Sequence, residues 1–310
     1  TSVSTVKQRG PEGGTVMNMP ERITVDGTSA LIYHVDSTPS TNDLAISLLA
    51  DTATPTPHLT TIIADQQSAG RGRLGRTWVA PDGQALLAST IVALPASLPS
   101  DQLGWLVHAC ALSIRDALST RLQPLGRTVA LKWPNDVLVD GTRKICGILA
   151  QLAPASSPFT TAVILGYGIN IAQRPDNLAT AQATSLYAEG DDEAAQDTDS
   201  VIRSVLADVL RGLDERIRSL IANGNAADSG LADEATVAQP LIGQRIALAE
   251  PTDPTGRVAL EGVAISLTST GSLLVRTDDG RTHDINAGDV LATGIPLTTV
   301  HDTKEKRANN

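Results

Sequence analysis

Three arginines and three glycines alternate within one short segment of this chain, Gly70 to Thr77, which reads GRGRLGRT. Glycines let the backbone approach an anion closely, and guanidinium groups supply positive charge and forked donors for phosphate or carboxylate oxygens. One arginine in a surface turn would be ordinary, but three interleaved with glycine are not. The segment therefore predicts a binding site for an anionic ligand.

The same segment formally matches two phosphate-binding motifs, G-x-G-x-x-G and G-x-x-x-x-G-K-[ST] with Arg76 in the lysine position. In both motifs the glycine loop opens a helix, whose N-terminal amides point at the phosphate. Here the loop is followed by Trp78 to Gly83, WVAPDG, which does not predict a helix. We therefore expect neither a Rossmann dinucleotide site nor a P-loop, and keep only the prediction of an anionic ligand.

Further polar groups stand at the ends of predicted strands. Lys132 to Asp136, KWPND, combines a cation, an amide and a carboxylate, and Arg143 to Leu149, RKICGIL, opens the next strand with two cations. Gly166 to Asn170, GYGIN, closes an apolar strand with paired glycines and an amide. Paired glycines suit the close approach of a ligand, although a tight turn uses them as well. Taken singly, each segment fits an ordinary turn as well as it fits a binding site.

The elements that must position these groups alternate between strand-like and helical patterns. Ser40 to Asp51 is predicted to be helical with Ser40 as its N-cap, which puts Ser40-Thr41-Asn42 at a helix start. Apolar spacing predicts two more helices, Leu103 to Leu122 and Ser200 to Ile221. Strands are predicted at 60–64, 85–94, 129–133, 137–139, 144–152 and 161–165. From about Pro240, short strands separated by Gly and Asp, including 272–277 and 281–285, indicate a small β-barrel.

Length and composition exclude several classes of protein. The 310 residues exceed one typical domain, and 24 Lys plus Arg against 34 Asp plus Glu give a net charge of −10, which disfavours a general nucleic-acid-binding surface. No apolar run reaches the ~20 residues of a membrane span, and residues 1–20 lack the apolar core of a signal peptide. The two cysteines, Cys110 and Cys146, lie in apolar runs, so we expect no disulfide framework and a cytoplasmic location.

Several segments carry no predicted chemistry. Residues 1–20 and 299–310 are polar or charged and aperiodic, which is typical of mobile tails. The acidic stretch from Glu189 to Asp199 is predicted to be a surface loop before a helix. The five histidines show no metal-ligand spacing, so we expect satisfied or solvated imidazoles at His34, His58, His108, His283 and His301.

Taken together, the motifs resemble the biotin protein ligase family. The resemblance rests on Ser40-Thr41-Asn42, on Gln67 to Arg76, and on the three strand-end segments described above, in that order along the chain. It spans roughly residues 30 to 298, because Gly262 to Val290 is similar to the C-terminal domain of that family. The resemblance implies an α/β (α+β) fold, a mixed β-sheet with flanking helices like that of class II aminoacyl-tRNA synthetases, followed by a small SH3-like β-barrel. We expect a catalytic domain over residues 21–238 and the barrel over 239–298.

Such enzymes condense biotin with ATP to biotinyl-5′-AMP and pyrophosphate, and then transfer the biotinyl group to a lysine of a biotin carboxyl carrier protein domain. By family position, the catalytic residues would be Lys144, Arg71 and Asp136. Biotin would be bound by Ser40, Thr41, Asn42, Gln67, Arg71, Gly72, Arg73 and Lys144. ATP and the adenylate would be bound by Arg71, Arg73, Arg76, Trp78, Lys132, Asn135 and Asn170, with Trp78 stacking against adenine.

The resemblance also implies Mg²⁺, held near Asp136 and Asn170, because this ion uses one or two carboxylates and keeps several waters. Asp136 is also expected to assist deprotonation of the acceptor lysine. Some members carry an N-terminal DNA-binding domain, but the ~30 residues ahead of the motifs are too few for three packed helices, so no specific DNA binding is expected. No membrane association is expected either, and we expect a monomer or a weak homodimer.

Two departures from the family pattern stand out. Thr38-Pro39 separates Asp36-Ser37 from Ser40-Thr41-Asn42, and we assign biotin contact to the copy adjoining Asn42; Tyr167 occupies a position that is usually small. Two alternatives remain open. A lipoate protein ligase shares the acyl-adenylate chemistry, although the short hydroxyl and amide side chains suit the ureido ring of biotin better. A non-catalytic anion-binding regulator would need the arginine loop alone, and Lys144 with Asp136 argues against it.

Overall fold

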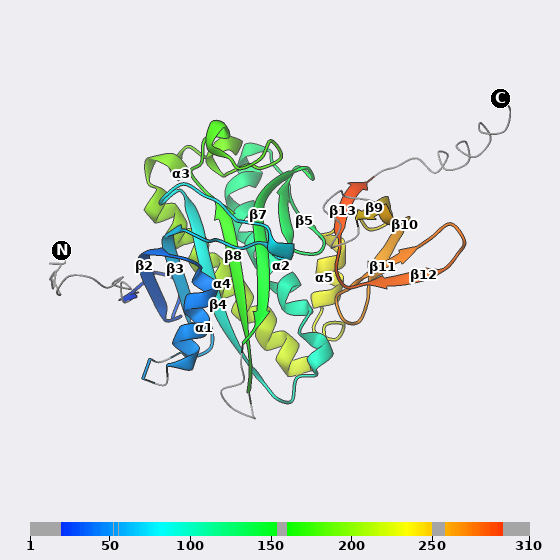
Figure 1. Ribbon diagram of the computed structural model, residues 1–310, viewed down its shortest axis with the longest axis horizontal. Coiled ribbons are helices and arrows are strands. Elements are labelled where there is room, and N and C mark those ends of the chain that lie inside the picture. Colours follow the sequence, from blue (N-terminus) through cyan, green and yellow to red (C-terminus); the bar gives the residue numbers. More distant parts are fainter. Residues whose placement is uncertain (1–19, 52, 55, 154–159, 250–257, 294–310) are drawn as a thin grey trace.

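The structure is a computed structural model that describes residues 20–293, except for 52, 55, 154–159 and 250–257 (Figure 1). The predicted tails, 1–20 and 299–310, lie outside the described residues apart from Pro20. None of the helices in the described ranges combines the length and the apolar character needed to cross a bilayer.

A large mixed sheet forms the centre of the first part of the chain. Its eight strands lie in the order β1-β2-β3-β4-β8-β7-β6-β5, and β2 and β3 form the parallel pair. The strands β4 and β8 pair along their whole length, from Ala85 opposite Asn170 to Pro95 opposite Thr160. The bounds are Glu21–Ile23 (β1), Ile32–Thr38 (β2), Thr61–Gln67 (β3), Ala85–Pro95 (β4), Val129–Lys132 (β5), Asp136–Val139 (β6), Arg143–Leu152 (β7) and Thr160–Asn170 (β8).

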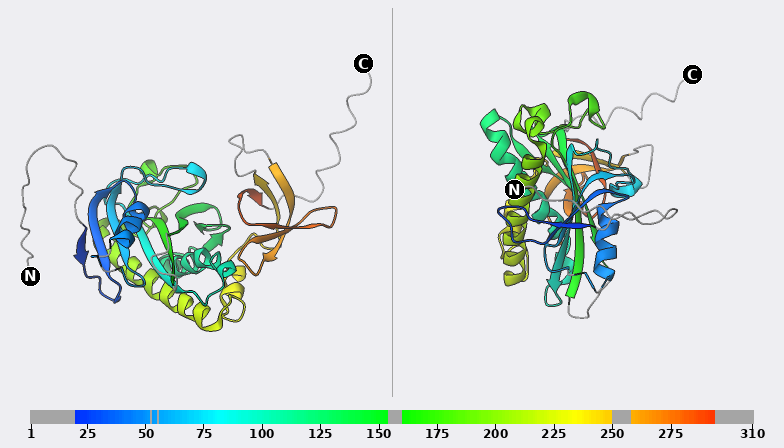
Figure 2. Two further views of the ribbon diagram at one scale, coloured as in Figure 1. Left: turned by 60° about the horizontal axis from the view of Figure 1, so that its bottom comes forward. Right: turned by 90° about the vertical axis from the view of Figure 1, so that its left-hand side faces the viewer.

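The helices α2 (Trp105–Leu122) and α4 (Thr198–Asn223) cover one face of this sheet, while α1 (Thr41–Ala50) lies on the opposite face (Figure 2). Alternate residues of β8 point to opposite faces, as a strand requires. Leu165, Tyr167 and Ile169 join the core beneath α2 and α4. The opposite face is covered by α1 only in part, and it carries Gly166 and Gly168, whose lack of a side chain lets other groups pack closely against the strand.

A second, five-stranded antiparallel sheet forms the C-terminal part, in the order β12-β11-β10-β9-β13 (Figure 1). Its strands are Arg245–Ala249 (β9), Val258–Leu267 (β10), Leu273–Arg276 (β11), Thr282–Ile285 (β12) and Asp289–Thr293 (β13). Trp133 of the first part is buried in its apolar cluster. Trp105 Nε1 donates to Ser269 O at 2.8 Å, and the buried His108 donates from Nε2 to Gly271 O at 2.9 Å. These contacts dock the C-terminal sheet against α2.

The predicted fold class is confirmed: a mixed sheet with flanking helices is followed by a separate small β domain. The patterns in the sequence did not identify the short elements β1, α3 (Glu193–Gln196) and α5 (Leu231–Val237), nor β2, a seven-residue strand between β1 and β3. Ser40 is the N-cap residue of α1, but its side chain makes no capping bond. The prediction of a capping hydroxyl was therefore wrong, and Ser40 instead contributes to the lining of a cavity.

The acidic stretch from Glu189 to Asp199 is largely exposed and precedes α4, as predicted, but it contains the short helix α3 and two buried carboxylates. Glu189 is buried, and Arg143 donates to its carboxylate from Nε at 2.6 Å and from Nη2 at 2.8 Å. Asp191 is buried and accepts from Arg121 Nε at 2.6 Å. The stretch includes α3 and fastens it to the sheet, which a count of like charges in the sequence does not reveal. Cys110 and Cys146 are buried and free, and burial raises the pKa of the Cys110 thiol.

Candidate active site

A cavity of about 470 Å³ opens on the face of the large sheet that α1 covers only in part. Every residue predicted for the site lines it, although these residues come from separate segments of the chain. The lining includes Ser40, Thr41, Asn42, Gln67, Arg71, Gly72, Arg73, Arg76, Trp78, Lys132, Asn135, Asp136, Lys144 and Asn170. The order of the strands brings them together. The strand β3 is followed in the sheet by β4, β8, β7 and β6, so the motifs at the end of β3 face those on β8, β7 and β6.

One end of the cavity is formed by the first turn of α1 and the end of β3. Gln67 Oε1 accepts hydrogen bonds from Thr41 N at 2.8 Å and from Thr41 Oγ1 at 3.2 Å. Beneath them Ser89 Oγ lies 2.7 Å from Thr41 Oγ1 and donates to Asn42 Oδ1 at 2.6 Å. Thr41, Asn42, Gln67 and Ser89, which we call the hydroxyl–amide group, thus hold one another in fixed orientations. Ser89 was not predicted, because it is a single serine within an apolar strand.

The floor of the cavity is made of glycines on β7 and β8. Gly147 and Gly168 are opposite each other in the two strands. A Cβ atom on Gly168 would lie 2.5 Å from Trp78 Nε1, and one on Gly166 would lie 2.9 Å from Asn42 Cγ. Real Cβ atoms do not approach so closely, so a larger residue at either position would displace the side chain of Trp78 or of Asn42. The paired glycines of the GYGIN segment therefore seat an indole ring and an amide against the sheet.

The arginine loop closes over this floor as a tight hairpin. Gly72 N donates to Arg76 O at 2.7 Å, and Trp78 N donates to Gly70 O at 2.9 Å. Leu74 adopts a positive φ of 56° at the tip. The hairpin explains why neither helix-dependent phosphate motif applies: Trp78 returns antiparallel to Gly70 instead of starting a helix.

Each arginine of the loop has a protein partner. Arg71 forms an ion pair with Asp43 of α1, and Arg76 forms one with Asp289 of β13. Arg73 Nη1 donates to Asn135 Oδ1 at 3.3 Å and to Gly288 O at 3.4 Å. Burial lowers the pKa of the Arg73 guanidinium, and the charge of Asp136 opposes that change. The loop is thereby fastened to the C-terminal sheet, and Asp289 and Val290 complete the cavity wall.

A single lysine lies at the middle of the floor. Lys144 Nζ lies 2.6 Å from Asp136 Oδ1 and 5.7 Å from the centroid of the Trp78 ring. Its backbone is fixed on the other side, because Lys144 N donates to Gln182 O at 2.7 Å and Lys144 O accepts from Thr184 N at 2.8 Å. Asp136 and Trp78 therefore hold a cation above Gly147 in the open part of the cavity.

The opposite end of the cavity lies at the end of β8. Asn170 Nδ2 donates to Thr184 O at 2.8 Å, and Asn170 Oδ1 accepts from Gln173 Nε2 at 2.9 Å. The segment after Asn170 supplies further lining residues that the sequence reading missed, namely Gln173, Asn177, Leu178, Ala179, Thr180 and Ala183. These residues carry no recognisable motif, so no sequence signal marked them.

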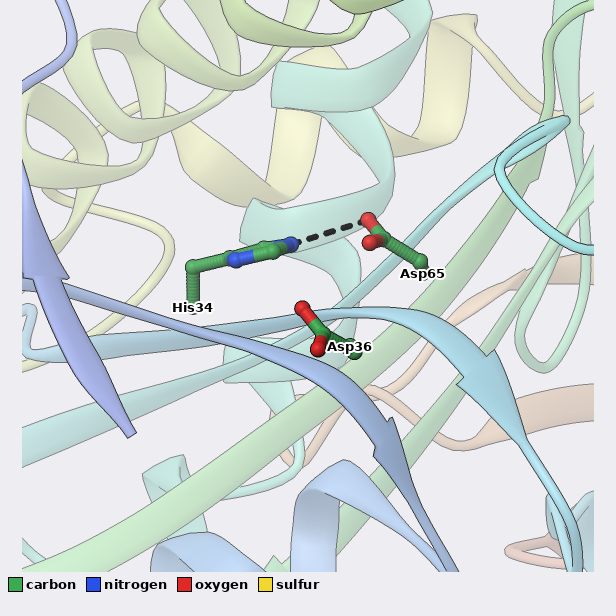
Figure 3. Close-up of side chains that lie close together, drawn as sticks. All are labelled: His34, Asp36 and Asp65. Carbon is green, nitrogen blue, oxygen red and sulfur yellow. Dashed lines mark hydrogen bonds and ion pairs between the residues drawn. The ribbon is translucent and has the colours of Figure 1, made fainter. Parts of the chain in front are cut away.

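His34, Asp36 and Asp65 form a separate group on the large sheet (Figure 3). The parallel pairing of β2 with β3 aligns Val35 with Ala64 and Ser37 with Gln66, which brings the two aspartates opposite each other. His34 Nε2 and Asp65 Oδ1 are 2.9 Å apart, and these side chains are 25% and 47% exposed. The other described histidines with partners are His58, which lies 3.6 Å from Asp214 Oδ1, and His108. His34 thus connects two strands, which its position in the sequence did not indicate.

Comparisons with known proteins place this chain in a family. The profile of the Biotin/lipoate A/B protein ligase family matches residues 34–170, and that of the biotin protein ligase C-terminal domain matches residues 241–291. The predicted domain boundary at residues 238 and 239 stays a prediction.

Two curated relatives are both called biotin--[acetyl-CoA-carboxylase] ligase. That of Mycobacterium tuberculosis is 34% identical over 74% of this chain and 77% of its own length. That of Paracoccus denitrificans is 31% identical over 71% of this chain and 85% of its own length. A solved structure of a biotin protein ligase from Aquifex aeolicus, in complex with biotin and ATP, has the same fold, with a TM-score of 0.62 and 23% identity over 85% of this chain and 98% of that one. The predicted resemblance is confirmed, and this chain belongs to the biotin protein ligase family.

Proposed function

We propose that this protein is a biotin protein ligase that condenses biotin with ATP to biotinyl-5′-AMP and pyrophosphate. It then transfers the biotinyl group to a lysine of a biotin carboxyl carrier protein domain. The relatives' names, which specify acetyl-CoA carboxylase as the target, support a carboxylase carrier domain as the acceptor.

One observation carries this proposal: the polar groups along the cavity stand in the order of the parts of biotinyl-AMP. The hydroxyl–amide group lies over Gly166, Lys144 and Trp78 lie over Gly147 and Gly168, and Asn170 closes the far end. At the usual rise of a strand, about 13 Å separates Gly166 from Asn170. That span accommodates a ureido ring at one end, an acyl phosphate near the lysine, and a nucleoside at the other end.

The hydroxyl–amide group suits the ureido ring of biotin, which offers a carbonyl acceptor and two N–H donors. Ser40, Thr41 and Asn42 are each at most 4% exposed, so their interactions with a ligand are protected from water. Hydrogen bonds in such a site discriminate strongly, because an analogue without matching groups leaves buried polar atoms unpaired. The dithiolane ring of lipoate lacks these groups, which favours biotin as the substrate.

The first reaction brings the carboxylate of biotin to the α-phosphate of ATP, and these two anions repel each other. Lys144, Arg71 and Arg73 offset this repulsion and stabilise the negative charge that develops during transfer. The ion pair with Asp136 orients Lys144, while the pairs of Arg71 with Asp43 and of Arg76 with Asp289 hold the loop over the adenylate. The loop therefore retains the intermediate and shields it from hydrolysis.

Mg²⁺ neutralises charge on the phosphates of ATP when it is bound. Among the described residues that line the cavity, the carboxylates are Asp136 and Asp289, which pair with Lys144 and Arg76. This set fits an ion that would be held mainly by phosphates and water, with Asp136, the carboxylate beside Lys144, as its one protein ligand. Asn170 is already held by two hydrogen bonds, so we assign it to the nucleoside rather than to the metal.

In the second reaction the acceptor lysine must lose a proton, because an unperturbed lysine has a pKa of about 10.4. We assign this role to Asp136, which lies at the middle of the cavity. An Asp136→Asn enzyme that forms the adenylate and transfers it at normal rates would contradict the assignment.

The decisive experiment is biotin-dependent exchange of pyrophosphate into ATP. The wild-type protein should catalyse exchange with biotin but not with lipoate or octanoate, and Lys144→Ala should lower the rate at least ~100-fold. Arg211→Ala, which removes an exposed cation of α4, is the matched control and should keep full activity. Exchange supported by lipoate alone would overturn the choice of substrate, and binding of ATP without exchange would favour a regulator.

A further inference from the structure

Gln173 is a buried amide at the nucleoside end of the cavity, and it has no role in the two proposed reactions. It follows the end of β8, lines the cavity, and is 1% exposed. Its backbone is held in place, because Ser185 Oγ donates to Gln173 O at 2.6 Å. The side chain is thus as fixed as those of the hydroxyl–amide group.

The hydrogen-bond network determines which atom of the Gln173 amide is free. Thr184 O can only accept, so the group of Asn170 that faces it at 2.8 Å must be the donor Nδ2. The oxygen of Asn170 then faces Gln173, and that oxygen in turn needs a donor, which is Gln173 Nε2 at 2.9 Å. The remaining atom, Gln173 Oε1, is therefore an acceptor.

This acceptor has no partner among the residues that the structure describes. Among the described residues that line the cavity, Gln173 Oε1 and Trp78 Nε1 are buried side-chain atoms without a hydrogen bond or an ion pair. Buried acceptors in folded proteins are almost always satisfied, so an unsatisfied one that lines a binding cavity indicates a donor on the ligand.

The ligand group at this end is a nucleoside under the proposed function, on which this inference rests. The N–H donors of biotin belong at the hydroxyl–amide group, at the opposite end of the cavity. Leu178, Ala179 and Ala183 contribute apolar lining beside Gln173, and such surfaces suit a flat heterocycle better than the hydroxyls of a ribose.

We propose that Gln173 determines the choice of nucleotide, with Oε1 accepting a hydrogen bond from the exocyclic amine of adenine. Guanine and hypoxanthine carry a carbonyl oxygen at the corresponding position, which is an acceptor. Placed against Gln173 Oε1, that oxygen would leave two acceptors facing each other without a proton between them. The site therefore admits ATP and rejects GTP and ITP.

Competition between nucleotides tests the proposal. In pyrophosphate exchange with biotin, the wild-type kcat/KM for ATP should exceed that for ITP at least ~100-fold. Gln173→Leu keeps the size of the side chain and removes the acceptor, so it should reduce this ratio at least ~10-fold, mainly by lowering kcat/KM for ATP. Gln196→Leu, an exposed glutamine of α3, should leave the ratio unchanged.

Three outcomes would overturn the proposal. Equal losses with ATP and ITP would mean that Gln173 only positions Asn170. A change in the ratio of ATP to 2′-deoxy-ATP, with the ratio of ATP to ITP unchanged, would assign the acceptor to the ribose. If the wild-type kcat/KM values for ATP and ITP were nearly equal, the enzyme would not select between these nucleotides at all.

Calorimetric binding of ATP and ITP separates this inference from the proposed function. If the wild-type protein binds ATP in preference to ITP and Gln173→Leu abolishes that preference, the assignment of Gln173 holds even if no exchange occurs. Absence of exchange would then refute the proposed ligase activity alone.

Discussion

The seat of Trp78 on two glycines makes a sharp prediction for Gly168→Ala. The new Cβ would lie 2.5 Å from Trp78 Nε1, whereas ordinary contacts begin at 3.4 Å, so the indole must move by about 1 Å. A misplacement of that size in an active site can cost ~100-fold in rate, and we expect a loss of this order in adenylate formation. Because Trp78 lies on a surface loop that can yield, thermal unfolding should change little.

Single-turnover formation of biotinyl-AMP measures this effect, and tryptophan fluorescence reports the displacement. Trp105 and Trp133 are 1% and 2% exposed, so a red shift in emission would arise from Trp78. Gly147→Ala is a comparison with a smaller displacement of Trp78, because its Cβ would lie 3.0 Å from Trp78 Cζ3; it also lies 3.1 Å from Lys144 Nζ, so the red shift in emission and not the rate is the quantity to compare. In a protein that already carries Trp78→Ala, Gly168→Ala should lower the rate of biotinyl-AMP formation little further. An equal loss in both backgrounds would refute the reasoning, since the alanine would then act directly on the ligand.

Three other changes have defined outcomes. Ser89→Ala removes the hydroxyl that contacts Thr41 and Asn42 and should raise the KM for biotin about tenfold with the KM for ATP unchanged; equal changes in both would contradict a local role. Asp289→Ala frees Arg76 from the C-terminal sheet and should increase release of biotinyl-AMP in single-turnover assays, whereas unchanged release would disprove the tether. For Glu189, burial raises the pKa, but the hydrogen bonds from Arg143 and the other polar partners outweigh it, so the folded pKa lies below the usual value. Its contribution to stability should therefore be complete above the unfolded pKa of about 4.3 and disappear as the pH falls through the folded pKa. Glu189→Gln should make the melting temperature depend less on pH between about pH 5 and pH 3. If the slope of melting temperature against pH is the same in wild type and variant, this carboxylate is not its source.

Local patterns predicted much of the fold. The long apolar stripes of α2 and α4 and the apolar runs of β4 and β7 identified these elements to within two residues, because burial of one face imposes a period on the sequence, whereas the predicted strand 161–165 covers only the first half of β8. The short edge strand β1 and the helix α5 were missed, since they gain their stability from neighbours instead of from a pattern of their own, and β2 was missed although it lies inside the sheet, because polar residues interrupt its apolar pattern.

The sequence by itself determined the chemistry of this protein: an arginine–glycine loop, a lysine and a set of short polar side chains, each recognisable by type and spacing. The tertiary structure alone decided which groups meet. Only the packing of α1 on β4 brings Ser89 to Thr41 and Asn42, and only the docked C-terminal sheet brings Asp289 to Arg76. The role of Gln173 likewise depends on Thr184, which fixes the amide of Asn170 and so leaves Gln173 Oε1 free. The physical reason is that hydrogen bonds and burial depend on distance in space, which local sequence does not encode.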